Sequence, residues 1–425
     1  MIPQVDYSSS DSAPLTHSYD YIVAGAGCAG LSLLWYMLDS PLQEARILLV
    51  DRDLSAQPKK TWCFWGDESL PFRHIADHSW NRMAVGFPNQ WVEERLGQNV
   101  YHCVRSEVYH AHVMERIQAH PNVTLLTAEI NELQDTADGA RLKAGGQAYT
   151  AGHLFQSCFI SPHDKAQPVH YPLRQHFGGW EVETAAPAFD PSVVTLMDFD
   201  TAQHGATVFY YLLPFTPTRA LVEYTVFSPD PWDHARYDAA IHRYIREHTD
   251  AAYEIIRREY GVIPMEERPR HQRYGQHITS LGTVGGITKP TTGYTFQRVH
   301  QHTQQLVRTM LPDGRPDPVA ISSPRYRFYD LLLLRILHEH PRWGRPIFQR
   351  LFAHNSIDRV LSFIGEDTHL GQDMRIFSQL PYGPFLRAIA PNLPLMPRVL
   401  FPEEPAVGTP RHSATPSDPT AAVAS

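Results

Sequence analysis

The chain has 425 residues, of which 43% are hydrophobic and 19% are charged, and its formal net charge at pH 7 is −8. A chain of this length and apolar content can bury a large core, so wholesale disorder is excluded and two or three structural units are expected. Because 45 acidic residues outnumber 37 basic ones and no lysine or arginine block occurs, we expect no nucleic-acid partner.

The N-terminal pattern predicts the start of a parallel sheet with a buried helix. Residues 1–17 have the composition of a disordered lead-in. Apolar strands are expected at Tyr19–Ala24 and Ala45–Val50, with a glycine turn and a helix over Leu31–Leu38 between them. Tyr21–Leu38 is uncharged over nearly the length of a membrane span, but its glycines favour a strand, a turn and a buried helix.

The next segment predicts one helix and several short strands. The helix is expected near Glu107–Ala119. Strands are expected at Asn122–Leu126, Arg141–Leu142 and Tyr149–Phe155, around glycine-containing turns.

From residue 166 to 230 the pattern changes to alternation of apolar and polar residues. Strands are expected at Trp180–Thr184, Thr207–Tyr211 and Ala220–Val226, which predicts a half-buried antiparallel sheet. Apolar residues then recur at helix-like intervals, so a helix is predicted over Asp233–Tyr260.

The C-terminal part predicts a loop, helices and a tail. A glycine-dense loop spans 282–293, and helical patterns follow at Tyr329–His338 and Pro346–Asn355. Residues 401–425 are rich in Pro, Ala, Ser and Thr and are expected to be disordered.

These patterns predict an α/β fold, a Rossmann-like dinucleotide-binding domain with an inserted antiparallel-sheet domain and a helical C-terminal part. The dinucleotide-binding domain would comprise 18–165 and 271–325, the substrate-binding sheet and helix 166–270, and the helical region 326–400.

The cysteines indicate neither a disulfide framework nor a zinc site. Cys28, Cys63, Cys103 and Cys158 lie far apart, with no CxxC or Cys/His ligand spacing. Free thiols fit a reducing compartment, and the first residues lack the basic and apolar regions of a signal peptide. We therefore expect a cytoplasmic location and no metal.

A glycine turn after the first strand carries the clearest chemical signal. An acid, Asp51, lies 21 residues past the last of these glycines, at the end of the next strand, where a carboxylate would bind ribose hydroxyls. Such a turn lets the backbone and a helix N-terminus approach a pyrophosphate. The pattern does not separate FAD from NAD, and the alternative is a glycine turn without a ligand. The residues of the turn are Gly25, Ala26, Gly27, Cys28, Ala29 and Gly30.

A second glycine-rich segment precedes a predicted helix. It could close over a flavin from the far side, or be only a flexible loop. Its candidate cofactor-binding residues are Gly282, Gly285, Gly286, Thr291, Thr292, Gly293 and Tyr294.

Glu223 is the candidate acid. On an alternating strand it shares a face with Leu221 and Thr225. If that face is the inward one, desolvation raises the pKa of the carboxyl and favours a neutral acid suited to general acid catalysis. The alternative is an outward glutamate on an ordinary strand.

Aromatic residues form a further candidate group. Trp62, Phe64, Trp65 and Trp180 could line a hydrophobic tunnel for substrate, or could simply be core. Glu366-Asp367 favours a polar helix edge over a catalytic dyad.

With these residues, the chain resembles the bacterial lycopene β-cyclase family of flavoproteins over roughly residues 19–390. The Thr-Trp-Cys-Phe-Trp and Val-Ile-Pro-Met motifs are specific, whereas many flavoproteins share the glycine turn. The matching segments are Tyr19–Ser32, Thr61–Trp65, Tyr211–Pro214, Leu221–Thr225, Tyr260–Met265, Gly282–Gly286, Thr291–Tyr294 and Phe363–Thr368.

The resemblance implies a non-covalent FAD used in its reduced form, with NAD(P)H as reductant, in a reaction without net redox change. Lycopene would become β-carotene by way of γ-carotene, and the family's essential acid falls on Glu223. The family usually carries two adjacent acids, and here the second position is Tyr224.

A hydrocarbon substrate also implies peripheral membrane association on the cytoplasmic face. Leu331–Leu337 and Phe377–Leu395 are apolar with scattered arginines and resemble an interfacial element, although both could pack on the core.

Two other functions remain open. A flavin-dependent hydroxylase of an apolar polyene would be expected to carry Gly-Asp where this chain has Gly282-Thr283. A non-catalytic carotenoid carrier would need no nucleotide-binding turn.

Overall fold

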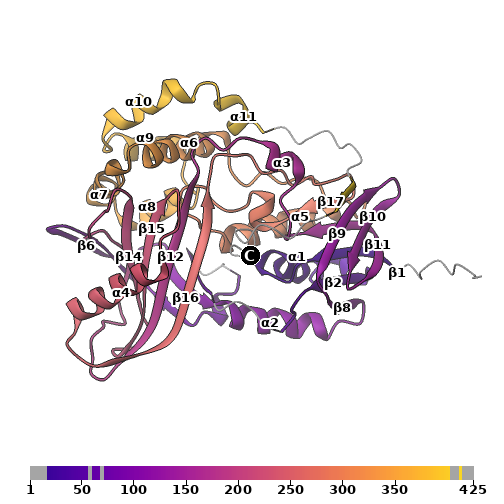
Figure 1. The fold of residues 1–425 in the computed structure, drawn as a ribbon, viewed down its shortest axis with the longest axis horizontal. Coiled ribbons are helices and arrows are strands. Elements are labelled where there is room, and N and C mark those ends of the chain that lie inside the picture. Colours follow the sequence, from indigo (N-terminus) through magenta and orange to yellow (C-terminus); the bar gives the residue numbers. More distant parts are fainter. Residues whose placement is uncertain (1–16, 56–59, 68–70, 403–410, 414–425) are drawn as a thin grey trace, which may run out of the picture.

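The computed structural model describes residues 17–55, 60–67, 71–402 and 411–413. Two large sheets lie on opposite sides of the molecule, and helices of the C-terminal part lie along one edge (Figure 1). The architecture confirms the predicted α/β fold with a Rossmann-like part, a second sheet and C-terminal helices.

The first sheet holds the dinucleotide-binding pattern. Its strands β17, β11, β1, β2 and β8 are parallel neighbours, and β10, β9 and β18 extend β11 as an antiparallel edge. The bounds are β1 His17–Ala24, β2 Ile47–Asp51, β8 Val123–Thr127, β9 Ile130–Thr136, β10 Gly139–Ala144, β11 Gln147–Gln156, β17 Ile278–Ser280 and β18 Arg411–Ser413.

Two helices pack together on this sheet. They are α1 (Cys28–Met37), directly after β1, and α5 (Phe296–Met310). Ser32 Oγ lies 2.8 Å from His300 Nδ1 and 2.7 Å from Thr303 Oγ1, which joins the two helices by buried hydrogen bonds.

The second sheet has seven strands in the order β16-β12-β15-β14-β13-β5-β6. One face packs against α4 (His234–His248), and the other faces the cavity described below and the C-terminal helices. The bounds are β5 Arg82–Phe87, β6 Gln90–Arg95, β12 Leu173–Thr184, β13 Val194–Asp198, β14 Thr207–Pro214, β15 Arg219–Ser228 and β16 Tyr253–Met265.

A three-stranded sheet, in the order β3-β7-β4, completes the strands, and β7 leads directly into α2 (Ser106–Gln118). Its bounds are β3 Thr61–Gly66, β4 His78–Trp80 and β7 Val100–Arg105.

The remaining elements are helices. No helix in the described part of the chain has the length and apolar character needed to cross a membrane. These remaining helices are α3 Pro162–Ala166, α6 Pro324–Glu339, α7 Gly344–His354, α8 Ile357–Ile364, α9 Leu370–Phe377, α10 Tyr382–Asn392, α11 Met396–Leu400, and the 3-10 turns η1 Pro41–Glu44, η2 Arg73–Ile75, η3 Gly282–Gly285 and η4 Pro341–Trp343.

The helix predicted over Asp233–Tyr260 is wrong in its second half. The helix ends at His248, and Tyr253 begins β16, which pairs with β12 along its whole length. Residues 253–258 alternate between half-buried and exposed, as a strand requires, and Ile256 is exposed. The three-residue spacing of Tyr253 and Ile256 imitated a helix.

The sheets also cross the predicted boundary at residue 165. Strands β5 and β6, from residues 82–95, belong to the second sheet, where β5 pairs in parallel with β13. The second sheet is therefore mixed rather than purely antiparallel. Its parallel partner comes from distant sequence, which local alternation cannot reveal.

Part of each predicted tail is ordered. His17 begins β1, and Arg411–Ser413 pair with β9, whose free edge offers unpaired backbone groups. The predictions for 1–16, 403–410 and 414–425 lie outside the described residues.

Candidate active site

The first glycine segment forms the turn between β1 and α1. A Cβ on Gly30 would lie 2.0 Å from the Gly25 carbonyl oxygen, and one on Gly25, whose φ is +110°, would lie 2.3 Å from Ser157 Oγ. Glycine is therefore required at both positions. Gly27 is the N-cap of α1, and no side chain in the described residues caps this end, so its backbone N–H groups suit a phosphate.

Asp51 lies beside this turn, at the end of β2. Its Oδ2 accepts a hydrogen bond of 2.7 Å from the Ala26 N–H, and its Oδ1 accepts one of 3.1 Å from the Asp53 N–H. Each carboxylate oxygen has a second lone pair, so Asp51 can hold the turn and still accept from a ribose hydroxyl. The structure brings the turn and the acid together, while their contact with a ligand stays a prediction.

The second glycine segment lies against the first. A Cβ on Gly282, which begins η3, would lie 3.0 Å from Ala29 Cβ on α1. Gly282, Gly286 and Gly293 all have positive φ values, of +58°, +79° and +72°. A Cβ on Gly293 would lie 2.6 Å from Gln175 Oε1 on β12. The loop therefore runs from α1 to the second sheet.

A cavity of about 150 Å³ lies between the second sheet, the three-stranded sheet, the start of α1 and this loop. Its lining is mainly apolar and aromatic, and it contains two carboxylic acids, Glu223 and Glu259. A dinucleotide bound along the glycine segments would reach this cavity, because both segments contribute to its wall. Other wall residues are Cys28, Lys60, Thr61, Trp62, Tyr211, Leu221, Thr292, Gly293, Tyr294 and Phe296.

Glu223 lies on the cavity face of β15. Its Oε1 accepts a hydrogen bond of 2.7 Å from Thr225 Oγ1. Burial, followed by the negative charge of Glu259, raises the pKa of the Glu223 carboxyl well above its usual value. The inward orientation confirms the first of the two faces considered for Glu223, and its role as a neutral acid stays a prediction.

Glu259 on β16 is a functional candidate that the sequence pattern concealed. Its Oε2 accepts a hydrogen bond of 3.0 Å from Thr61 Oγ1 and lies 3.6 Å from Arg257 Nη2. A strand prediction for 253–265 would have placed Glu259 and Arg257 on one face. The spacing of apolar residues instead predicted a helix for this segment, so the pair was not identified.

One group in the described residues has the spacing of metal ligands. Ligand atoms of His163, Asp164 and His271 all lie within 4.8 Å of one another. Asp164 Oδ2 accepts a 3.1 Å hydrogen bond from the His271 N–H, and Oδ1 lies 2.5 Å from His271 Nδ1. The Asp164–His271 contact joins α3 to the segment before β17.

Comparison with known proteins decides the family. A family model described as "Lycopene cyclase protein" matches residues 20–390. The chain belongs to the lycopene cyclase family.

Two relatives in the lycopene cyclase family align over most of the chain. A lycopene beta-cyclase of Pantoea ananas is 26% identical over 405 residues, covering 90% of this chain and 93% of the relative. A lycopene beta-cyclase of Paracoccus sp. (strain N81106 / MBIC 01143) is 27% identical over 406 residues, covering 89% of this chain and 99% of the relative.

Solved structures show the same fold. A flavoprotein/dehydrogenase from Cytophaga hutchinsonii has a TM-score of 0.57 at 10% identity, covering 85% of this chain and 99% of its own. A mutant of the halogenase PltM in complex with FAD has a TM-score of 0.54 at 11% identity, covering 85% of each chain. This member of the lycopene cyclase family thus shares the fold of both solved structures.

The aromatic residues predicted to bind substrate in this lycopene cyclase family member take different positions. Trp62 lines the cavity. Phe64 is buried and stacks on His102, with ring centroids 5.1 Å apart. The ring of Trp65 lies edge-on to Tyr294 at 4.6 Å.

The prediction that Trp180 lines the site for substrate is wrong. Trp180 lies on the opposite face of the second sheet, and its Nε1 donates a hydrogen bond of 2.9 Å to Asp238 Oδ1 on α4. On β12 it is one position beyond Gly179, which pairs with Glu223, so the side-chain alternation turns Trp180 away from the cavity.

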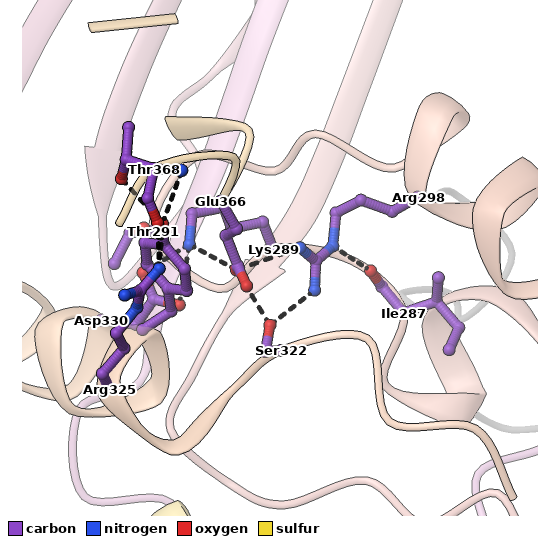
Figure 2. A network of polar contacts seen from close by, with 10 residues as sticks. Ile287, Lys289, Thr291, Arg298, Ser322, Arg325, Asp330, Glu366 and Thr368 are labelled. Carbon is purple, nitrogen blue, oxygen red and sulfur yellow. Dashed lines mark hydrogen bonds and ion pairs between the residues drawn. The ribbon is translucent and has the colours of Figure 1, made fainter. Parts of the chain in front are cut away.

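The sequence favoured a position for Glu366 on the polar edge of a helix, and this prediction is wrong. Glu366 belongs to a buried polar cluster (Figure 2), in which it accepts hydrogen bonds from Lys289 Nζ at 2.9 Å and from Arg298 Nη1 at 3.0 Å. Burial opposes its ionisation, but Lys289 and Arg298 outweigh that effect and hold the pKa of Glu366 below its usual value. The residue has a φ of +64°, in the left-handed region.

The same cluster anchors the second glycine segment. Lys289 Nζ also lies 3.0 Å from both oxygens of Asp330, and Thr291 Oγ1 donates a hydrogen bond of 2.7 Å to Asp330 Oδ1 (Figure 2). Thr291 therefore faces α6, whereas its neighbours Thr292 and Gly293 line the cavity. The cluster ties the loop to α6 and to the segment after α8.

Proposed function

We propose that the protein is a lycopene β-cyclase of carotenoid biosynthesis, an isomerase that converts lycopene to β-carotene by way of γ-carotene. The observation that carries this proposal is Glu223, a carboxyl whose pKa burial raises well above its usual value, in a mainly apolar cavity that adjoins the glycine turn. Membership of the lycopene cyclase family supports the same substrate class.

The proposed cofactor is FAD, bound without a covalent link. The required glycines at positions 25 and 30, the uncapped start of α1 and Asp51 fit the ADP half. The loop through Thr292, Gly293 and Tyr294 fits the flavin side, because it forms one wall of the cavity. When bound in its reduced form, with NAD(P)H as the reductant, FAD supplies electron-rich negative charge beside the cavity.

Glu223 acts as the acid in the proposed reaction. Its proton moves to a terminal alkene carbon of lycopene, so a C–H bond forms, a π bond breaks and a tertiary carbocation results. The neighbouring double bond attacks this cation and closes the ring, and the ring cation then loses a proton to a carboxylate. One proton enters and one leaves, so the step is an isomerisation and consumes neither oxidant nor reductant.

The cavity walls suit a short-lived cation. Trp62, Tyr211 and Tyr294 present aromatic rings, whose faces attract positive charge. At about 150 Å³ the cavity is smaller than the ~300–1,000 Å³ of sites that enclose whole ligands. We infer that only an end group of the polyene enters, while the rest of the chain stays outside.

Peripheral association with the cytoplasmic face of the membrane follows from a hydrocarbon substrate. Exposed large apolar residues gather on α9, α10 and the segments that follow α10, along one edge of the molecule (Figure 1). Leu331–Leu337 instead lies mostly buried in α6, so the docking surface is narrower than the sequence indicated. The exposed residues are Leu370, Met374, Tyr382, Leu386, Leu393 and Phe401.

The proposed function is tested in a bacterial host that accumulates lycopene. Chromatography should show β-carotene when the chain is expressed. Unchanged lycopene in cells that contain soluble, flavin-loaded protein would contradict it. Oxygen or NADPH consumption in proportion to product would instead indicate a hydroxylase.

A further inference from the structure

Two carboxylic acids face each other across a glycine on the cavity side of the second sheet. Gly179 of β12 pairs with Glu223 of β15 on one side and with Glu259 of β16 on the other. Residues directly opposite in a ladder point to the same face of the sheet. A Cβ on Gly179 would lie 2.9 Å from Glu259 Cγ and 3.3 Å from its Oε1, so the absent side chain leaves the space between the acids.

Glu259 is held so that one oxygen remains available. Oε2 receives the Thr61 hydroxyl at 3.0 Å and has Arg257 beside it. Oε1 is buried and has no hydrogen-bond partner among the described residues, although Glu259 lines the cavity. A buried carboxylate oxygen without a partner costs free energy unless a bound positive charge or donor uses it.

The support for the charged form of Glu259 continues behind the cavity. Arg257 donates from Nε to Glu181 Oε2 at 3.1 Å and from Nη2 to Thr61 Oγ1 at 2.6 Å. These bonds hold a guanidinium, which stays protonated, against Glu259. Among the residues that the structure describes, no cation pairs with Glu223, and the neutral hydroxyl of Thr225 donates a hydrogen bond to it.

The two acids therefore have different environments. Burial raises the pKa of both carboxyls. At Glu259 the negative charge of Glu181 adds to this rise, whereas Arg257 and Thr61 oppose it. At Glu223 the charge of Glu259 adds to the effect of burial. Acids whose environments separate their pKa values can divide the roles of proton donor and fixed charge between them.

Other titratable groups face the pair from neighbouring elements. Cys63 of β3, Tyr211 of β14 and Tyr294 of the loop act electrostatically on or with Glu223. Lys60 and Cys103 are within electrostatic reach of Glu259. None of these lies in the strands that carry the two acids, so substitutions at Glu259 leave them in place.

We propose that Glu259 is a second catalytic residue, a fixed carboxylate that keeps Glu223 protonated and stabilises the carbocation formed when Glu223 gives up its proton. This inference rests on the proposed function.

The first test needs no substrate. In flavin-loaded protein, infrared spectroscopy detects the carbonyl stretch of a protonated carboxyl, and Glu223→Gln identifies the band that belongs to Glu223. In Glu259→Gln the apparent pKa of that band should fall by about one pH unit or more, because a neighbouring negative charge is lost. Glu259→Asp, which retains the charge, should preserve most of the elevation. An unchanged titration in Glu259→Gln would overturn the proposal.

The second test follows conversion of lycopene. Glu259→Gln should lower the rate about 10²-fold, as expected when electrostatic stabilisation of a transition state is removed. The alkaline limb of its pH profile should also move to lower pH. The matched control is Glu254→Gln, an exposed glutamate on the same strand, which should behave as wild type. A wild-type rate in folded, flavin-loaded Glu259→Gln would refute the role of Glu259. A wild type that converts no lycopene would refute the proposed function instead, and the infrared result would stand by itself.

Discussion

Thr225 and Glu223 lie two residues apart on the same face of β15, with Thr225 Oγ1 2.7 Å from Glu223 Oε1. The hydroxyl donates to one carboxyl oxygen and leaves the other side of the group facing the cavity. A carboxyl in this position has a fixed direction before substrate arrives, which reduces the reorganisation needed for proton transfer.

Replacing Glu223 by Gln should remove the acid without changing its size. We expect conversion of lycopene to fall roughly 10²- to 10⁴-fold, the usual contribution of general acid catalysis, while flavin binding persists. Pigment analysis and the flavin absorbance of the purified variant check this. The control is Tyr224→Phe, the neighbouring residue on the opposite face, and an active Glu223→Gln variant would move the acid role elsewhere.

The raised pKa of Glu223 also predicts how stability depends on pH. The folded protein holds this proton above the usual carboxyl pKa of 4.5, so the stability that the neutral group contributes is complete below that value and is lost as pH rises through the higher folded pKa. Glu223→Gln cannot ionise, so its melting temperature relative to wild type should rise between pH 5 and pH 9. Thermal denaturation at both pH values measures this, and parallel melting curves for the two proteins would argue against the raised pKa.

A methyl group at Gly30 should interfere with the cofactor turn. Because a Cβ there would lie 2.0 Å from the Gly25 carbonyl oxygen, Gly30→Ala must move the turn away from the start of α1. We expect purified Gly30→Ala to contain much less FAD than wild type, as measured by flavin absorbance per protein. Gly383→Ala, where nothing lies within 4 Å, is the control. Full FAD content in Gly30→Ala would show that the turn does not hold the dinucleotide.

Removing Lys289 should destabilise the loop over the cavity. Lys289→Met leaves Asp330 and Glu366 buried without their shared cation, and loss of one partner of a buried pair costs about 3–5 kcal/mol. Denaturant unfolding gives the free energy of unfolding. The exposed pair of Arg46 and Asp20 serves as control, since solvent screens it and Arg46→Met should change stability far less. An equal loss of unfolding free energy in the two variants would mean that the buried cluster stabilises the fold no more than an exposed ion pair does.

Charged substitutions on the proposed docking surface of α9 and α10 should weaken binding to membranes. Leu386→Asp combined with Met374→Asp should reduce flotation of the protein with liposomes, because both side chains are exposed on α10 and α9. Turnover of lycopene supplied in detergent should be retained. The control is Leu311→Asp, which places the same charge at an exposed leucine that follows α5, and it should float as wild type does. Unchanged flotation of the double variant would place the docking surface elsewhere.

The local features of the site were predictable from sequence. The glycine turn, Asp51 and the apolar strands around them are neighbours in the chain or follow a fixed spacing. Glu223 was predictable as a candidate because alternation on one strand assigns it to the face of Leu221 and Thr225. The cavity face of β15 confirms that assignment.

Only the tertiary structure decided which distant residues meet at those features. Glu259 reaches Glu223 because β12 lies between β15 and β16, and Glu366 reaches Lys289 across 77 residues of chain. Trp180 turns away from the cavity for the same reason that Glu223 turns toward it, since the pairing of strands sets the face of every side chain. Spacing and alternation act along the chain and can be read from it. Pairing between strands and the burial of charges depend on contacts across the fold, so they become visible only when the chain is folded.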